Sequence, residues 1–434
     1  MEPARQDTRA KDCRLISFLH AADLHLDSPL KMLEQYEGAP VESLRLATRR
    51  GLTRLVDLAL ERKVDFVLLA GDIYDGDWKD FNTGLFFVRE MGRLSDARIP
   101  VVLIAGNHDA ANKMTRQLRL PTGVQMLSAE MPTTILWEDL GVAVHGQSFA
   151  SAAITDDLSK RYPLPTKGLF NIGLLHTCAE GREGHDRYAP CSINDLSRKG
   201  YDYWALGHIH RREVLLEDPF IVFPGNTQGR SIRETGPKGC LHVRISTTGT
   251  PEAEFVPLHV AQWEHLRVPV GPIDTMDTIL ERFEEILLQS IPPHPDVSLV
   301  ARVTLEGNGL PDQAWPRMDE WTSEIRSLAT ARTDGSAWIE SVRSAVSWSG
   351  KDSVDAHGHG ALAAILRQIE SLQSGQADLS PIQESLEAIL HKLPPELQSD
   401  TSIRLDGPAD IRVHLAEVTG LLTSLFREPG ADSP

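Results

Sequence analysis

Five short polar segments in the first half of the chain carry the residue types that bind divalent metal ions. Four of the five directly follow an apolar, strand-like run. Carboxylate, amide and imidazole ligands without cysteine suit Mn, Fe, Zn or Mg. The set predicts a two-metal site of the kind that hydrolyses phosphoesters. The segments are Asp23-Leu24-His25, residues 71–75 (GDIYD), residues 106–109 (GNHD), His176, and residues 207–210 (GHIH).

The spacing within the segments suits metal binding. Two pairs, Asp23 with His25 and His208 with His210, are each two residues apart at a strand end. In an extended chain, residues i and i+2 point to the same side, so each pair could hold one ion. The carboxylate of Asp72 could bridge two cations, one oxygen to each. The seven predicted ligands are Asp23, His25, Asp72, Asn107, His176, His208 and His210.

A second group of residues in the same segments could act on the substrate. Two ions about 3.5–4 Å apart activate a water for attack and neutralise the phosphate oxygens. His108 has no ligand role if Asn107 binds metal, because neighbouring side chains diverge. We therefore predict that His108 contacts the phosphate or protonates the leaving oxygen. Asp109 then either orients His108 by a hydrogen bond or caps the next helix.

The apolar runs that precede these segments must position them. Strands are expected at 14–20, 64–70 and 100–105, and helices at 41–62 and 81–96. Such alternation predicts a parallel or mixed sheet covered by helices. Further strands are expected at 133–137, 142–147, 170–175, 201–206, 213–216, 220–223 and 240–245, and the layered α/β sandwich should end near Val260.

The composition changes after Val260. A strand–helix–strand pattern over residues 265–306, followed by alternation at 337–347, predicts a small α+β domain. A glycine-, serine- and histidine-containing linker follows. The last part of the chain has leucines at helical spacing, which predicts helices that either pack on each other or bind a partner.

Bulk properties restrict the class of protein. The chain has 434 residues, 41% hydrophobic and 24% charged, which is ordinary for a globular protein with two or three domains. No apolar run is long enough for a membrane span, and the polar N-terminus is not a secretory signal. The four cysteines lack CxxC spacing, so we expect reduced thiols in a cytoplasmic protein. The net charge of −17 opposes strong unaided binding to nucleic acid.

The ordered motifs DLH, GDIYD, GNHD, LLHT and GHIH resemble those of the calcineurin-like metallophosphoesterase superfamily. Within it the chain is similar to the SbcD-type DNA repair nucleases, and most of all to the YhaO-type exonuclease branch. The matching stretches are FLHAADLHLDSPL, GDIYDGDWKDFNTGLFF, HDRYAPCSINDL, YDYWALGHIHRREVL and FPGNTQGRSIRETGPKGC, all before residue 260.

The resemblance implies a four-layer α/β/β/α sandwich in residues 1–260. It implies a small α+β capping domain at 261–348, a linker at 349–360 and a helical region at 361–434. It places one metal on Asp23, His25, Asp72 and His210, and the other on Asp72, Asn107, His176 and His208. Mn is the expected ion, with Fe, Zn and Mg as alternatives, and no membrane association is expected. DNA is the expected substrate, and an SMC-like coiled-coil ATPase is the expected partner. A homodimer is compatible with the resemblance.

The resemblance also assigns the residues around the metals. His108 matches the catalytic histidine of the family. Eukaryotic and archaeal nuclease relatives have a second histidine three residues after the bridging aspartate, where this chain and the bacterial SbcD-type proteins have aspartate, here Asp75. Asp75 is therefore expected to orient substrate or water.

Three functions remain open on the sequence alone. The first is a metal-dependent DNA exonuclease or endonuclease of DNA repair, which the region after residue 260 favours. The second is a phosphodiesterase or phosphatase on a small molecule or nucleotide, which the acidic charge favours. The third is a regulatory subunit of an ATPase complex, which the intact His108 argues against.

Overall fold

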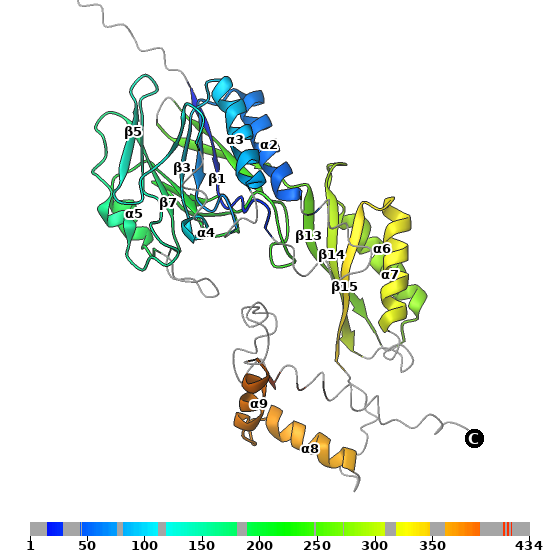
Figure 1. Ribbon diagram of the computed structural model, residues 1–434. Helices are drawn as coiled ribbons and strands as arrows, with labels where there is room; N and C mark the ends of the chain where they lie inside the picture. The colour runs from blue at the N-terminus through cyan, green and yellow to red at the C-terminus, as the bar shows by residue number, and fades with distance from the viewer. Residues whose placement is uncertain are drawn as a thin grey trace, which may run out of the picture. The chain divides into compact units, whose positions relative to one another are not determined.

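The structure is a computed structural model that forms two compact units (Figure 1). The first unit comprises Met1–Glu264 and Pro292–Val300, and the second His265–Ile291 and Ala301–Pro434. The predicted linker, 349–360, lies outside the described residues, and the predicted division into four parts stays a prediction. The described residues are 15–28, 44, 46–75, 81–111, 119–179, 189–246, 249–271, 273–308, 318–347, 361–390, 411, 412, 415 and 418.

Two six-stranded mixed sheets form the centre of the first unit. In the first sheet, the neighbouring pairs β1–β2, β2–β3 and β3–β4 are parallel, while β11 pairs antiparallel with both β1 and β12. Its strand order is β12 (Pro251–Pro257), β11 (Gly239–Ile245), β1 (Ile16–Ala21), β2 (Phe66–Ala70), β3 (Val101–Ile104) and β4 (Val124–Met126).

The second sheet also has three parallel pairs and two antiparallel pairs, but here one antiparallel pair lies at each edge. Its order is β5 (Thr133–Trp137), β6 (Val142–Gly146), β7 (Phe170–His176), β8 (Tyr203–Gly207), β10 (Phe220–Phe223) and β9 (Glu213–Glu217). The helical elements of this unit are α2 (Ala47–Arg62), α3 (Asn82–Asp96), α4 (Asn107–Ala111), a 3₁₀ turn at Leu158–Arg161 and α5 (Ile193–Arg198).

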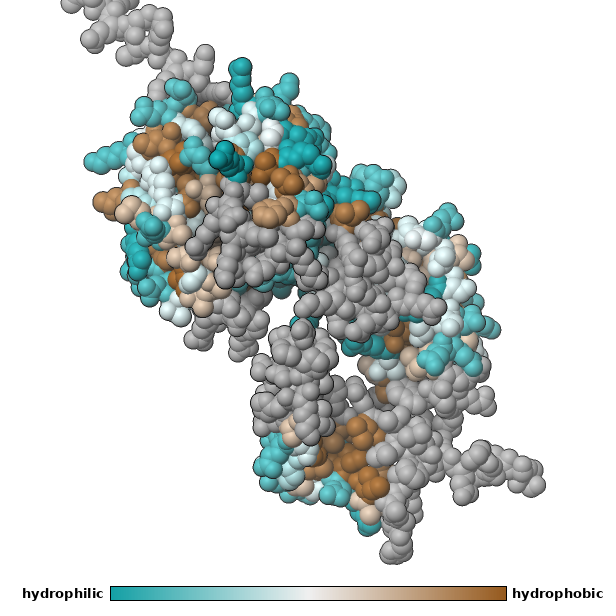
Figure 2. Space-filling view, viewed as in Figure 1, coloured by the Kyte–Doolittle hydropathy of each residue, from teal (hydrophilic) through white to brown (hydrophobic). Residues whose placement is uncertain are grey.

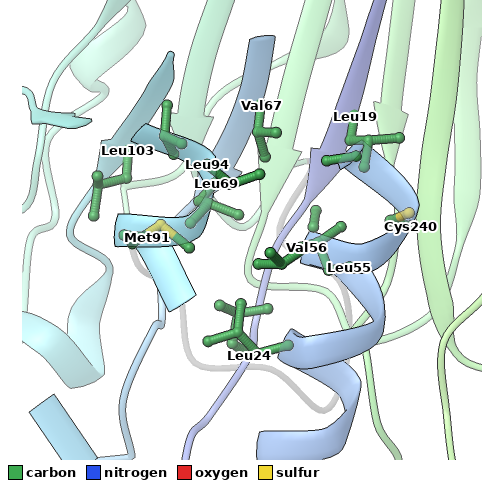
Figure 3. Packing of buried hydrophobic residues seen from close by; sticks show 14 of the residues in the cluster. Leu19, Leu24, Leu55, Val56, Val67, Leu69, Met91, Leu94, Leu103 and Cys240 are labelled. Atoms are coloured by element: carbon green, nitrogen blue, oxygen red, sulfur yellow. The ribbon is translucent and has the colours of Figure 1, made fainter. Parts of the chain in front are cut away.

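Alternating side chains of the strands create three apolar layers. In β1, Phe18 packs between the two sheets, whereas Leu19 packs under α2 and α3 (Figure 3). In β8, Tyr203 packs between the sheets and Trp204 packs outward with the 3₁₀ turn and α5. Because successive side chains of a strand point to opposite faces, each sheet packs one face against the other sheet and its outer face against helices. The predicted α/β/β/α sandwich is therefore confirmed.

Two strands of the first sheet, β4 and β12, are absent from the prediction. Strand β12 has the sequence PEAEFVP and lies at the edge of its sheet, where proline and charge are tolerated. Strand β4 has only three residues, two of them exposed. Neither has the apolar run on which strand prediction depends.

The described residues between 261 and 347 form a separate three-stranded sheet and two helices. The sheet has the order β13 (Ala261–Val270), β14 (Ser298–Asn308) and β15 (Ala337–Ser347). Helix α6 (Met276–Ser290) begins with a capping box between Thr275 and Thr278 and buries Phe283. Helix α7 (Met318–Thr333) buries Trp321. This is the small α+β fold expected after Val260.

Two further helices, α8 (Ala361–Gln373) and α9 (Ser380–Leu390), follow in the chain. They share a small cluster in which Ile369, Leu372 and Leu379 are buried. Figure 2 shows apolar surface over α8, where Ile365 is 40% exposed. Among the helices of the described residues, none combines the length and hydropathy that a bilayer crossing requires.

Candidate metal centre

The five polar segments meet where the carboxyl ends of strands from both sheets come together. The segment after β1 runs beside the segment after β2, because Asp23 N donates to Gly71 O and His25 N to Asp72 O, both at 3.0 Å. At the ends of β7 and β8, Thr177 N donates to Gly207 O at 3.1 Å. The first sheet thus presents Asp23, His25, Asp72 and Asn107, and the second presents His176, His208 and His210.

The backbone at these ends is left-handed rather than extended. The φ angles are 53° at Asp23, 42° at His25, 51° at Asp72 and 104° at His208. The expectation that Asp23 and His25 share one side of an extended chain was therefore wrong. Non-glycine residues with positive φ are strained, and such strain is concentrated at functional sites.

Glycines allow the strand ends to approach one another. A Cβ on Gly207 would lie 1.9 Å from Ala70 O, so only glycine lets β8 end this close to β2. A Cβ on Gly106 would lie 2.2 Å from Asp72 Oδ1 and 2.8 Å from His176 Cε1. Both sheets can therefore contribute side chains to one small volume.

All seven predicted ligands come together there. Three overlapping groups each have ligand atoms within 4.8 Å of one another: Asp23–His25–His210, His25–Asp72–His108 and Asp72–His176–His208. Asn107 joins the last group, because its Oδ1 lies 3.0 Å from His176 Nε2. Such clusters of histidine and aspartate are typical of dimetal phosphoesterases.

The carboxylate of Asp72 lies between the groups. Its Oδ2 faces both His176 Nε2 at 3.4 Å and His25 Nε2 at 3.8 Å, while its Oδ1 accepts the backbone N–H of His108 at 3.0 Å. One oxygen, rather than both, is thus directed at the shared volume. Although burial raises the pKa of Asp72, its histidine neighbours hold that pKa well below the usual range.

Both ring nitrogens of His176 face hydrogen-bond acceptors. Its Nδ1 must carry a proton, because it lies 2.9 Å from the carbonyl oxygen of Ala70, which can only accept. A neutral ring then has a lone pair on Nε2, yet Nε2 faces oxygens of Asn107 and Asp72. Burial lowers the pKa of His176, but the negative charge of Asp72 and their hydrogen bond raise it to about 9. A proton or a metal ion is required between these acceptors.

A hydrogen bond joins His25 and His210. Their Nε2 atoms lie 3.1 Å apart, and burial lowers the pKa of His25 to about 3, so its ring is neutral. Burial also raises the pKa of the adjacent Asp23 to about 6. Buried nitrogen and oxygen donors that face one another are the donor set of a divalent metal site, and the residues fit that group.

His108 lies beside the clusters and is paired with Asp75. Its Nδ1 is 2.9 Å from Asp75 Oδ1, and its side chain is 41% exposed. Burial lowers the pKa of His108, but the hydrogen bond to Asp75 and the charges of Asp72 and Asp75 raise it above the ordinary value. The carboxylate that faces the His108 ring is therefore that of Asp75.

Asp109 has a different environment. It is buried, and its oxygens accept the backbone N–H groups of Gly106, Ile73 and Tyr74 at 2.9–3.1 Å. Gly106 precedes α4, so Asp109 caps this short helix from its third position. The same bonds tie α4 to the segment after β2. Of the two roles predicted for Asp109, these contacts match the cap.

Two charged residues that the sequence had not singled out border the centre. Arg230 and Glu234 belong to the stretch FPGNTQGRSIRETGPKGC, noted above only as a resemblance. Glu234 Oε1 lies 2.7 Å from His210 Nδ1, and Arg230 Nη1 lies 3.3 Å from Asp75 Oδ2. Their spacing of four residues in a glycine-bounded loop carries no metal-ligand signal, and only the fold brings them here.

Comparison with known proteins agrees with this geometry. Residues 16–212 match the calcineurin-like phosphoesterase family, and residues 263–347 match the middle domain of the metallophosphoesterase YhaO. The chain is 36% identical over 274 residues to a protein of Bacillus subtilis named "Uncharacterized metallophosphoesterase YhaO", covering 62% of this chain and 67% of that protein. The chain belongs to the calcineurin-like metallophosphoesterase family.

More distant relatives carry a functional name. The chain is 25% identical over 212 residues to the "DNA double-strand break repair protein Mre11" of Saccharolobus solfataricus, covering 47% of this chain and 52% of that protein. The protein of the same name from Sulfurisphaera tokodaii is 27% identical over 206 residues, 46% of this chain and 50% of that protein. The chain thus spans about half the length of these relatives.

Proposed function

We propose that this protein is a two-metal phosphodiesterase that cleaves DNA as an exonuclease or endonuclease of DNA repair. The observation that carries the enzymatic part is the His108–Asp75 pair beside the ligand clusters. A site that only bound metal would have no use for a partly exposed histidine held by a carboxylate next to the ions. The DNA part is supported by similarity to the two Mre11 proteins.

The residues divide the work as follows. Asp23, His25, Asp72 and His210 would hold one ion, and Asp72, Asn107, His176 and His208 the other. When bound, divalent ions, Mn in our proposal, supply charge neutralisation of the phosphate and a nucleophile at neutral pH. Asp75 accepts the Nδ1 proton of His108 and favours the charged ring. His108 thereby holds a proton that Nε2 can give to the leaving oxygen.

The first test is hydrolysis of end-labelled linear DNA with Mn. His108→Ala should lower the rate about 10²–10⁴-fold, the usual contribution of a general acid, while Mn affinity stays unchanged. His294→Ala, which removes a histidine whose side chain is 62% exposed, is the matched control. DNA left intact by the native protein would contradict the proposal.

One observation favours a second candidate, a phosphodiesterase or phosphatase on a small molecule or nucleotide. The net charge of −17 gives the chain little attraction for a polyanion. A DNA nuclease of this charge needs a partner that carries much of the DNA binding. Rapid turnover of cyclic or aryl phosphodiesters by the same sample, with DNA intact, would establish the second candidate.

The partner in our proposal is an SMC-like coiled-coil ATPase that docks on the C-terminal helices. The apolar surface of α8 supports this, since Ile365 is 40% exposed there. Ile365→Asp should weaken co-purification of a coiled-coil ATPase from the same genome and leave aryl phosphodiester hydrolysis intact. Unchanged co-purification would exclude this docking surface.

The setting in our proposal is the cytoplasm, without membrane association. Among the described residues, Cys178, Cys191 and Cys240 are free and buried, which suits a reducing compartment. We also propose a homodimer. The molar mass of the purified protein, measured by light scattering, tests this. The regulatory alternative would require that His108→Ala retain full function in cells.

A further inference from the structure

Glu234 is a buried carboxylate with four hydrogen-bond donors. Its Oε2 accepts from the backbone N–H of Arg230 at 2.8 Å and from Asn226 Nδ2 at 2.9 Å. Its Oε1 accepts from Arg230 Nη2 at 3.0 Å and faces His210 Nδ1 at 2.7 Å. Three of these donors fix the carboxylate in place, so that the fourth contact fixes His210.

This contact decides which nitrogen of His210 carries a proton. A carboxylate oxygen cannot donate, and two lone pairs 2.7 Å apart would repel, so the proton lies on Nδ1. Arg230 Nη2 also approaches Nδ1, but at the longer distance of 3.3 Å. The neutral ring therefore has its lone pair on Nε2, which points toward His25 and the shared volume. Lys238 Nζ fixes the backbone of the same residue through His210 O at 2.9 Å.

Arg230 links this contact to the other side of the centre. Its Nη2 bonds Glu234, while its Nη1 lies 3.3 Å from Asp75 Oδ2 and 3.4 Å from Ser28 Oγ. Asp75 in turn holds His108. The side chain of Arg230 is 19% exposed, so its charge acts with little screening by water. One planar guanidinium thus spans two carboxylates that orient two different histidines.

We propose that Glu234 and Arg230 are positioning residues of this phosphoesterase, with separate effects. Glu234 sets the tautomer of His210 and so the affinity for metal. Arg230 holds Asp75 against His108 and so the protonation of the leaving group. The proposal rests on the proposed two-metal hydrolysis, but not on DNA as the substrate.

Metal affinity tests Glu234. Titration calorimetry with Mn alone should show binding about 10–100-fold weaker for Glu234→Ala, the usual cost of losing a carboxylate behind a ligating histidine. Glu234→Gln keeps an acceptor for Nδ1 and should lose less, which also guards against misfolding of the alanine variant. Glu254→Gln removes a carboxylate 3.6 Å from His242, outside the centre, and is the matched control. Native Mn affinity in Glu234→Ala would overturn the proposal.

Leaving-group dependence tests Arg230. Arg230→Gln should lower kcat for phosphodiesters with poor leaving groups, which need a proton, and spare those with a nitrophenolate leaving group. KM should change little, and Mn affinity should fall less than in Glu234→Ala, because Glu234 keeps its bonds from Arg230 N and Asn226 Nδ2. Arg230→Lys keeps the charge but loses the planar fork, so it should rescue only part of the loss. Arg93→Gln, which removes an arginine paired with Asp57 and Glu90, is the control.

Other outcomes separate the two proposals. An equal loss with good and poor leaving groups would reduce Arg230 to a structural role. If the native protein leaves DNA intact but these effects appear with aryl phosphodiesters, the DNA proposal fails and the positioning roles stand. If DNA is cleaved and neither variant differs from native protein, the positioning roles fail and the DNA proposal stands.

Discussion

Buried histidines in the sandwich and buried histidines in the metal centre have opposite hydrogen-bond environments. In the sandwich, His20 meets Tyr203 Oη at 2.9 Å and Leu206 O at 3.1 Å, so each ring nitrogen has a complementary partner. In the centre, His176 Nε2 faces two oxygens. His20 and His176 are both fully buried.

This difference teaches that burial alone does not identify a metal ligand. A satisfied histidine stabilises the fold, whereas one whose acceptor faces other acceptors costs free energy until a cation arrives. The centre tolerates this cost because the surrounding strands hold the side chains in place. Metal binding should therefore stabilise the centre and leave the sandwich histidines unaffected.

The largest effect should come from forcing apart the strand ends where the centre histidines meet. Gly207→Ala places a methyl group 1.9 Å from Ala70 O, which is backbone and cannot rotate away. We expect a loss of more than about 4 kcal/mol of stability and no Mn binding, since overpacking against a fixed backbone is among the costliest changes. Denaturant unfolding and titration calorimetry measure the two effects.

Gly92→Ala is the control for this change. Gly92 lies in α3, and nothing lies within 4 Å of its missing Cβ. Alanine in a helix interior should stabilise the protein by up to about 1 kcal/mol. If Gly207→Ala bound Mn with native affinity, the close approach of β8 to β2 would not be needed for the centre.

The second prediction replaces one histidine of the metal centre, His176, and one histidine of the sandwich, His145, with glutamine. His176→Gln should abolish most of the stabilisation by Mn, because it removes a ring nitrogen that faces the oxygens of Asn107 and Asp72. His145→Gln should lower stability by about 1–3 kcal/mol and preserve the Mn effect, because it breaks a satisfied pair. His145 bonds Thr134 Oγ1 at 2.9 Å and Asn171 Oδ1 at 3.1 Å.

Thermal unfolding with and without Mn distinguishes the two variants. The comparison fails if His176→Gln keeps the stabilisation by Mn. It also fails if both variants lose the Mn effect, because the sandwich histidine would then be coupled to the centre.

The sequence placed most of the candidate ligands at strand ends, because four of the five polar segments follow an apolar run. Asp72 follows β2 and His176 ends β7, so the strand pattern alone placed both at one edge of the sandwich. The convergence of all seven ligands needed the further fact that the two sheets pack face to face. The order of the motifs, which resembles that of the family, implied that the two sheets pack face to face. The periodicity of the strands alone could not imply it.

What escaped prediction depends on contacts distant in sequence. The ring of His108 faces Asp75, 33 residues away in the chain, rather than the adjacent Asp109, since hydrogen bonding depends on side-chain direction. The left-handed backbone at Asp23 is imposed by pairing with the segment after β2. Arg230 contacts Asp75 across 155 residues of chain, and Glu234 contacts His210 across 24. No local pattern encodes such contacts.

The pH dependence that His20 contributes is absent at neutral pH and appears only in acid. Burial lowers the pKa of His20 from an ordinary value of 6.5 to about 3, despite its hydrogen bond to Leu206. Between these values the unfolded chain binds a proton that the folded protein does not. The stability is therefore fully present above about pH 6.5 and is lost as pH falls toward 3, by about 1.4 kcal/mol per unit.

His20→Gln should reduce the slope of the free energy of unfolding against pH by the contribution of one proton. The variant should also be less stable overall. The measurement is denaturant unfolding at several pH values in the presence of a chelator, so that metal release adds no slope. His294→Gln controls for loss of an exposed imidazole. An unchanged slope in His20→Gln would mean that His20 takes up its proton without unfolding, and that the sandwich histidines are not satisfied as neutral rings.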